Sequence, residues 1–190
     1  MKYKKTLLAV LLVTIILVPA RPEVSAAFWH LRHGFTAEAD GITFKVPFCY
    51  RRLEHYASPS DSSLFLINKP GFFRSVFTSS GQADYAIFYI SANSLPAAGR
   101  THEMIIDSLS KTYLRGDYKK TAERTLTLAG QPGRCVEFTF FLMHTEKHQS
   151  DNSVTIFCRF GDSAQAEFDG TPKTVSDFYD ILQTAKPAMR

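Results

Sequence analysis

The sequence lacks the short motifs that mark the common catalytic and nucleotide-binding sites. Its 190 residues contain no G-x-S-x-G turn for a serine nucleophile, no G-x-x-x-x-G-K-[ST] loop and no G-x-G-x-x-G turn for phosphates. The zinc motif H-E-x-x-H is begun at His102-Glu103 but not completed, because Ile106 stands where the second histidine is needed. These absences remove the chemistries that local spacing can reveal, and they favour a protein that is not an enzyme.

The first 26 residues have the composition of a secretory signal peptide. Three lysines within the first five residues precede an apolar run over residues 7–18, and small residues follow at 24–27. This run is short of the roughly 20 residues that span a bilayer as a helix. We therefore predict a signal peptide over residues 1–26, cleaved after Ala26, with cleavage one residue later or a retained anchor as the alternatives. The expected location is secreted or periplasmic, with no stable membrane insertion after cleavage.

Strong charge of either sign is absent once the leader is set aside. The full chain carries a net charge of +4, but residues 1–26 hold four basic residues against one acidic residue. The remainder has 18 basic and 17 acidic residues, a net charge of +1. A nearly neutral domain has no long-range field to attract nucleic acid or an anionic membrane surface. We expect no nucleic-acid partner.

Cysteines are few, at Cys49, Cys135 and Cys158. Export would permit a disulfide, and the last two cysteines fall on neighbouring predicted strands. Their alternation argues against this pairing, because Cys158 alternates with apolar residues whereas Cys135 alternates with Glu137 and Thr139. Side chains on opposite faces of a sheet cannot be linked without a bulge. We expect three buried thiols, with a disulfide between Cys135 and Cys158 as the alternative.

Apolar patterning predicts a sheet. Residues 42–48 alternate as in a half-buried strand, 64–67 and 72–77 are candidate strands, and 85–90 is apolar throughout, as in a strand covered on both faces. Four further strands are joined by short turns and one polar loop, which makes them an antiparallel meander. These four strands are predicted over residues 124–129, 135–144, 154–160 and 164–168.

Two helices complete the predicted elements. Residues 101–115 show apolar residues at helical spacing. A second helix is predicted to begin at Thr171 with proline in its first turn, and its apolar residues recur at i, i+3, i+4 and i+7. The two acidic residues of this helix, Asp177 and Asp180, are expected on its outer, solvent-exposed face.

No repeat, linker or low-complexity stretch divides the chain after the leader. Residues 27–40 show no clear period and are expected to be irregular, with Trp29 outside the domain and His30 and His33 in a mobile terminus. Residues 41–186 are expected to form one domain with the order strands, helix, strands, helix. The fold class is therefore α+β, an antiparallel sheet with helices packed on it.

Three local patterns resemble the Mog1/PsbP-like superfamily. They are the opening strand from Gly41 to Pro47, the strand-turn-strand over residues 126–134, and the closing helix around residues 178–182. This sequence departs from the family where an aromatic residue, often tryptophan, follows the first strand, since Phe48-Cys49-Tyr50 stands there. The resemblance covers most of residues 41–186 and implies an α/β/α sandwich around an antiparallel sheet.

The same resemblance implies little about chemistry. Members of the superfamily include photosystem accessory subunits, a partner of a small nuclear GTPase and exported bacterial proteins of unknown role, most of them without known catalytic activity. A fold does not fix a function, so no residue role carries over.

Histidines are the remaining candidates for a catalytic or metal site. His144 and His148 are four residues apart, but in a predicted polar loop this spacing does not aim both rings at one metal. A hydrolase would need His55, His102 or His144 hydrogen-bonded to a serine or cysteine in a cleft. We therefore assign no catalytic, cofactor-binding or metal-binding residue.

The expected function is binding rather than catalysis. We expect an exported, non-enzymatic domain that binds a protein partner or supports a cell-envelope assembly. The first competing hypothesis is a carrier of a small hydrophobic ligand, with a pocket lined by some of the 16 phenylalanines and eight tyrosines. The second is a small hydrolase whose site is assembled from distant residues, and the third is metal storage or sensing through His144 and His148.

Overall fold

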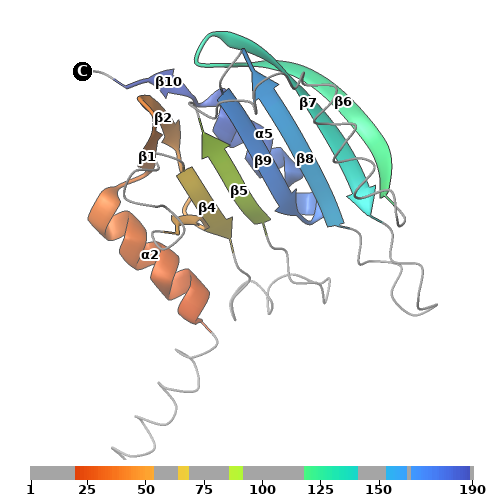
Figure 1. Ribbon diagram of the computed structural model, residues 1–190. Coiled ribbons are helices and arrows are strands. Elements are labelled where there is room, and N and C mark those ends of the chain that lie inside the picture. Colours follow the sequence, from red (N-terminus) through yellow and green to blue (C-terminus); the bar gives the residue numbers. More distant parts are fainter. Residues whose placement is uncertain are drawn as a thin grey trace, which may run out of the picture.

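The computed structural model describes residues 20–53, 64–68, 86–91, 118–140, 153–161 and 164–188. Its helices are α2 (Arg21–His33), the 3-10 helix η2 (Pro172–Thr174) and α5 (Val175–Gln183). The strands are β1 (Thr36–Ala39), β2 (Ile42–Lys45), β3 (Arg51–Arg52), β4 (Leu64–Asn68), β5 (Ala86–Ser91), β6 (Tyr118–Leu128), β7 (Gln131–Phe140), β8 (Ser153–Phe160), β9 (Ala164–Gly170) and β10 (Lys186–Pro187). Figure 1 shows their arrangement.

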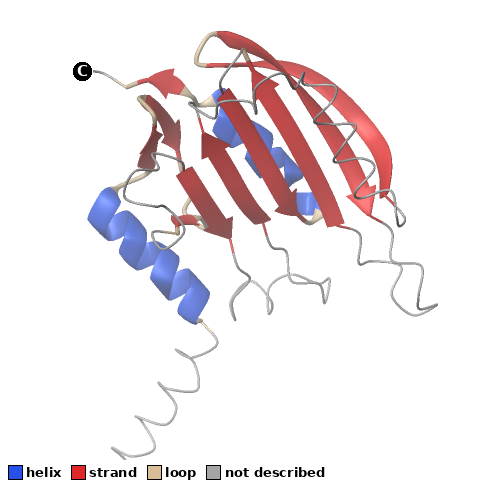
Figure 2. Cartoon of the chain, in the orientation of Figure 1, coloured by secondary structure: helices blue, strands red, loops and turns tan. Residues whose placement is uncertain are grey.

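Two antiparallel sheets organise these elements. The large sheet has the strand order β3-β4-β5-β9-β8-β7-β6, and the small sheet has the order β1-β2-β10. Strand β9, the last strand of the meander, pairs with β8 on one side and with β5 on the other. It therefore joins the meander to the strands β3, β4 and β5. Helix α5 covers one face of the large sheet, and α2 lies at its β3–β4 end (Figure 2). The α+β class with an antiparallel sheet is confirmed.

The meander forms with shifted bounds. Strand β6 begins at Tyr118, earlier than expected, and the turn into β7 consists of Ala129 and Gly130, with φ of 48° and 89°. A two-residue hairpin turn with both φ values positive matches the twist of its strands, and glycine adopts this conformation readily. Gly133, which lies between the predicted strands 124–129 and 135–144 and is therefore expected in the turn, is instead inside β7, where an added Cβ would collide with the ring of Phe160.

Aromatic side chains fill the space between α5 and the large sheet. Phe88, Phe168 and Phe178 contact one another with ring centroids 5.4 to 5.5 Å apart, and each is 1% exposed or less. Offset aromatic contacts of this kind add to the free energy gained by burying the rings. The apolar stripe predicted for the last helix is therefore the stripe that packs on the sheet.

Two tyrosine hydroxyls fasten α5 to the rest of the fold. The buried Tyr50 donates to Asp177 Oδ2 over 2.7 Å, and Tyr179 donates to Glu137 Oε1 over 2.7 Å. The prediction that both acidic residues of this helix face solvent is wrong for Asp177, which is half-buried, whereas Asp180 is exposed. A carboxylate can lie on the inner side of a helix when a buried donor meets it.

The expectation that residues 27–40 are irregular is wrong. The helix α2 runs to His33, and β1 follows it and pairs with β2. Trp29 is 9% exposed and belongs to the hydrophobic core, so it lies inside the domain. Helix α2 also passes through the bond after Ala26, where leader removal is expected, and that removal stays a prediction.

The expectation of three thiols is also wrong, because Cys135 and Cys158 form a disulfide. They are direct partners in the register of β7 and β8, with their Cα atoms 4.0 Å apart. The alternation argument failed because it assigns Glu137 to the solvent face, whereas this residue is 7% exposed and points toward α5. The half-buried Cys49 stands outside this disulfide.

Several predictions concern residues that the structure does not describe. The helix over 101–115, the strand over 72–77 and the histidines at positions 55, 102, 144 and 148 lie outside the described residues. Within the described ranges, no helix is long and apolar enough to cross a membrane.

Candidate functional site

Helix α2 carries apolar side chains on both of its faces. Ala26, Trp29 and His30 recur at i, i+3 and i+4 and are buried against the domain. Phe28 and Leu31 lie three residues apart on another face, where they are 68% and 84% exposed. A surface helix ordinarily shows one apolar stripe toward the core and a polar face toward water. The exposed stripe of α2 is therefore not explained by the packing of the domain.

The end of α2 is held by a buried histidine. His30 is 4% exposed; its Nδ1 lies 2.8 Å from the carbonyl oxygen of Gly34, and its Nε2 lies 3.1 Å from that of Pro47. A neutral imidazole carries one N–H, so both carbonyl oxygens can accept at once only from the doubly protonated ring. The sequence pattern predicts that His30 lies in a mobile terminus, whereas the structure uses its ring to join α2 to the segment after β2.

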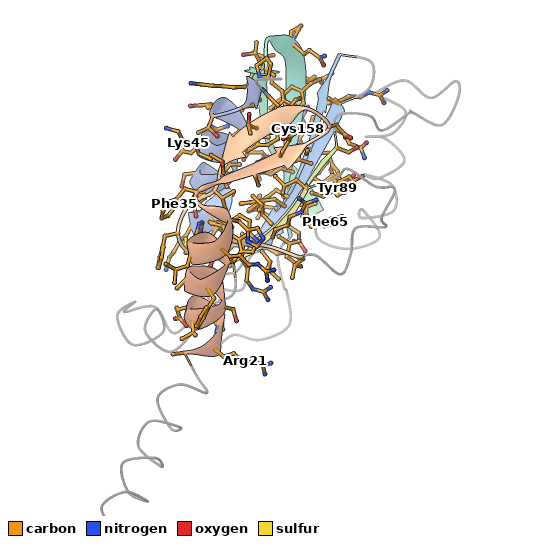
Figure 3. All side chains as sticks on the ribbon, turned by 90° about the vertical axis from the view of Figure 1, so that its left-hand side faces the viewer. Arg21, Phe35, Lys45, Phe65, Tyr89 and Cys158 are labelled. Atoms are coloured by element: carbon orange, nitrogen blue, oxygen red, sulfur yellow. A yellow bond between two sulfur atoms is a disulfide. The ribbon has the colours of Figure 1, made fainter. Side chains whose placement is uncertain are left out.

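Two exposed aromatic rings stack on this histidine. The centroid of the His30 ring lies 4.6 Å from that of Phe35 and 5.6 Å from that of Phe48, at interplanar angles of 23° and 16°. Each phenylalanine is nevertheless 58% exposed. Phe35 lies beside the C-terminal end of α2, as labelled in Figure 3. The buried imidazole therefore supports two rings that still face solvent.

We use the name aromatic surface for Phe28, Leu31, Phe35 and Phe48 together, because all four are exposed and lie either on α2 or in segments whose rings stack on its His30. Within the described ranges, five large apolar side chains are exposed, and four of them belong to this surface. The fifth, Ile87, lies on β5. Single exposed apolar residues are ordinary, but a group of them marks an interaction site. No single helical period contains all four, which is why sequence reasoning missed the group.

A cavity of about 360 Å³ lies at the opposite end of α2. Its lining combines residues from the first half of α2 with residues from β3, from β4 and from the segment just before β3. The lining residues are Arg21, Pro22, Ser25 and Ala26 from α2, with Cys49, Arg51 and Ile67. The cavity is thus built from segments distant in sequence, and no local motif could have revealed it.

A polar cluster beneath α5 is a different kind of feature. Glu137 Oε1 accepts from Tyr179 and, over 2.8 Å, from Arg124 Nε, while the Arg124 guanidinium lies 4.7 Å from the centre of the Tyr179 ring. Burial, aided by the hydrogen bond to Glu137, raises the pKa of Tyr179. None of these residues lines the cavity at α2. The cluster satisfies a buried carboxylate and positions α5.

The other sequence candidates do not assemble into a site within the described part of the chain. His33 Nδ1 lies 3.0 Å from the carbonyl oxygen of Trp29, one turn back along α2, and its ring stacks on that of Trp29. Over the same described residues, no group of three or more histidine, cysteine or acidic side chains could hold a metal ion.

Taken together, the sheet order and the covering helix define an α+β domain with an antiparallel sheet. No protein-family model matches the chain, and no curated protein matches it. A solved structure of PsbP (CyanoP) from Synechocystis sp. PCC 6803 is 10% identical and covers 79% of this chain and 90% of its own, with a TM-score of 0.44. The protein of unknown function PA94 from Pseudomonas aeruginosa is 12% identical and covers 82% and 97%, with a TM-score of 0.43. A likeness of this degree concerns the fold alone and says nothing of function.

Proposed function

We propose that this chain is an exported, non-enzymatic domain that binds a protein partner of the cell envelope through the aromatic surface. The observation that carries the proposal is the exposure of Phe28, Leu31, Phe35 and Phe48 on and beside α2. Fully burying one such side chain is worth about 1.5 to 3 kcal/mol, so a partner that covers all four gains a substantial part of a specific affinity.

The packing of two of these four side chains, Phe35 and Phe48, supports binding. Phe35 and Phe48 each stack on His30, whose ring contacts two backbone carbonyls. The two phenylalanine rings are therefore held in place on one side. Side chains that are already ordered lose less conformational entropy when a partner covers them. Aromatic residues are also enriched at the centres of protein interfaces.

Two further features support export of a folded domain. The leader has the composition of a signal peptide, and the disulfide between Cys135 and Cys158 suits an oxidising compartment. The four residues of the aromatic surface all follow Ala26, so the predicted cleavage would leave them in the mature chain. Cleavage would nonetheless shorten α2, and the packing of Trp29 and His30 would then have to hold what remains.

Photocrosslinking in the producing cell tests the proposal. A photoreactive amino acid at position 31, the most exposed of the four, should crosslink to one discrete envelope protein. The same amino acid at Thr127, which is exposed on the edge strand β6, is the matched control and should give no such product. The substitutions Phe35→Ser and Phe48→Ser should remove the crosslink at position 31, whereas Lys173→Ser on η2 should not. Equal products at positions 31 and 127, or none at 31, would overturn the proposal.

A further inference from the structure

The cavity at the start of α2 is a second candidate site, separate from the aromatic surface. We propose that it binds an amphipathic anion, a carboxylate or phosphate head on a short apolar body. The proposal goes beyond the proposed function, because it concerns other residues and another kind of ligand. It stands on the charges, the apolar wall and the size of the cavity.

Two arginines give the cavity its charge. Arg21 comes from the first turn of α2 and Arg51 from β3, and both line the same space. In the described part of the chain, neither guanidinium makes an ion pair or a side-chain hydrogen bond. Among the seven lining residues that the structure describes, none is acidic, and Glu23, in the same helical turn, is not one of them. Two like charges on residues that line one concave space repel each other, and a bound anion offsets that repulsion.

The geometry of guanidinium favours an oxyanion. Its planar fork of N–H donors matches the oxygen atoms of a carboxylate or a phosphate, and such charge-assisted bonds are about twice as strong as neutral ones. The hydroxyl of Ser25 adds a further donor to the same lining. Because Arg51 is half-buried, its charge is screened less by water than that of an exposed arginine.

The remaining lining explains the apolar body. Pro22, Ala26 and Ile67 give the cavity a hydrocarbon wall beside its two cations. A bare inorganic anion would leave that wall in contact with water, whereas a ligand with a short chain would cover it. A volume of about 360 Å³ is near the lower end of ligand sites, so the body must be small.

The site belongs to the chain that keeps its leader. Four of the seven lining residues precede Ala27, so cleavage after Ala26 would remove the site and leave the aromatic surface residues in place. The two proposals can therefore fail independently. The full chain, held in solution by an uncharged detergent, is the protein to test.

Calorimetric titration with hexyl phosphate is the direct test, with hexanol and inorganic phosphate as the two half-ligands. The full chain should bind hexyl phosphate at least ten times more tightly than either half-ligand. Arg51→Gln should weaken that binding at least tenfold, and Ser25→Leu, which fills the cavity while keeping both arginines, should do the same. Arg32→Gln, at an exposed arginine in the last turn of α2 outside the cavity lining, should leave the affinity unchanged.

Vesicles distinguish a soluble ligand from a lipid head group. Binding of the full chain to phosphatidylglycerol vesicles that is weakened by Arg51→Gln, with binding to phosphatidylcholine vesicles unaffected, would assign the anion to a lipid. The other outcome is that hexyl phosphate binding depends on Arg51, whereas the unsubstituted chain and the Arg51→Gln variant bind each vesicle type equally well. This result would assign the anion to a soluble molecule. Absence of any Arg51-dependent binding in both arms, or equal affinity for hexanol and hexyl phosphate, would overturn the proposal.

Discussion

The helices α2 and α5 pack on the same domain but use their apolar residues differently. In α5 the large apolar side chains Phe178, Ile181 and Leu182 are each 1% exposed or less, and the outward positions are polar. In α2 the buried stripe leaves Phe28 and Leu31 in solvent. A helix whose large apolar side chains are all buried against the domain contributes them to the stability of the fold. A helix that keeps some of them outside has apolar surface left for a partner.

The polar contacts of the two helices also differ: those of α5 join the layers of the fold, and those of α2 lie close to exposed rings. Helix α5 is fastened by two tyrosine hydroxyls, each donating to a carboxylate across the layers of the fold. Helix α2 is fastened at its end by one imidazole between two backbone carbonyls, close to the exposed rings. The polar contacts of α5 hold the layers together, whereas those of α2 hold in place the surface that it presents.

The largest expected effect separates the two helices by stability. Phe178→Ala removes a fully buried ring that contacts Phe88 and Phe168, and it should lower the free energy of unfolding by about 3 to 5 kcal/mol. The matched change in α2, Phe28→Ala, should alter it by no more than about 0.5 kcal/mol, because the ring is mostly in water. Urea unfolding of both variants measures the difference. Equal losses would mean that the exposed stripe of α2 is part of the core.

The contrast between the helices also explains how much the sequence could predict. Helix α5 shows one apolar period with a proline start, and the meander shows turns at short intervals, so local signals predict both. Helix α2 has buried and exposed apolar residues together with Arg21, Glu23 and Arg32, so no single period is visible. An amphipathic pattern predicts helices that have one apolar and one polar face. It does not predict a helix that also presents apolar side chains to solvent.

Polar residues on inward faces account for the other errors. Alternation and helical spacing assign Glu137 and Asp177 to the solvent side, but each meets a tyrosine hydroxyl from a distant part of the sequence. The misplaced face of Glu137 then hid the disulfide, because Cys135 shares that face. The cavity at α2 was unpredictable for a related reason: its two arginines come together only when α2 packs beside β3. Contacts between distant segments leave no periodic trace in a sequence.

A smaller effect is expected from the tyrosine hydroxyls of the α5 interface. Tyr179→Phe removes one of the two described side chains that donate to the buried carboxylate of Glu137, leaving Arg124, and should lower the free energy of unfolding by about 1 to 3 kcal/mol. Tyr50→Phe should cost about 1 kcal/mol, because Asp177 is only half-buried and water can replace the lost donor. Chemical unfolding of the two variants ranks them. A Tyr179→Phe variant as stable as the wild type would show that α5 is held by its apolar contacts alone.

Alkaline titration gives the finest version of the comparison, because α5 and its contacts involve Tyr50 and Tyr179 whereas α2 contains no tyrosine. Burial, followed by the hydrogen bonds to Asp177 and Glu137, raises the pKa of both phenols. A raised pKa in the folded state means that their stabilisation is fully present below the unfolded value near 10 and declines as the pH rises beyond it. Absorbance at the phenolate band should therefore show a late phase, from Tyr50 and Tyr179, that appears only as the protein unfolds. The double variant Tyr50→Phe with Tyr179→Phe should lose that late phase. Ionisation of all eight tyrosines while circular dichroism remains native would contradict the buried fastening of α5.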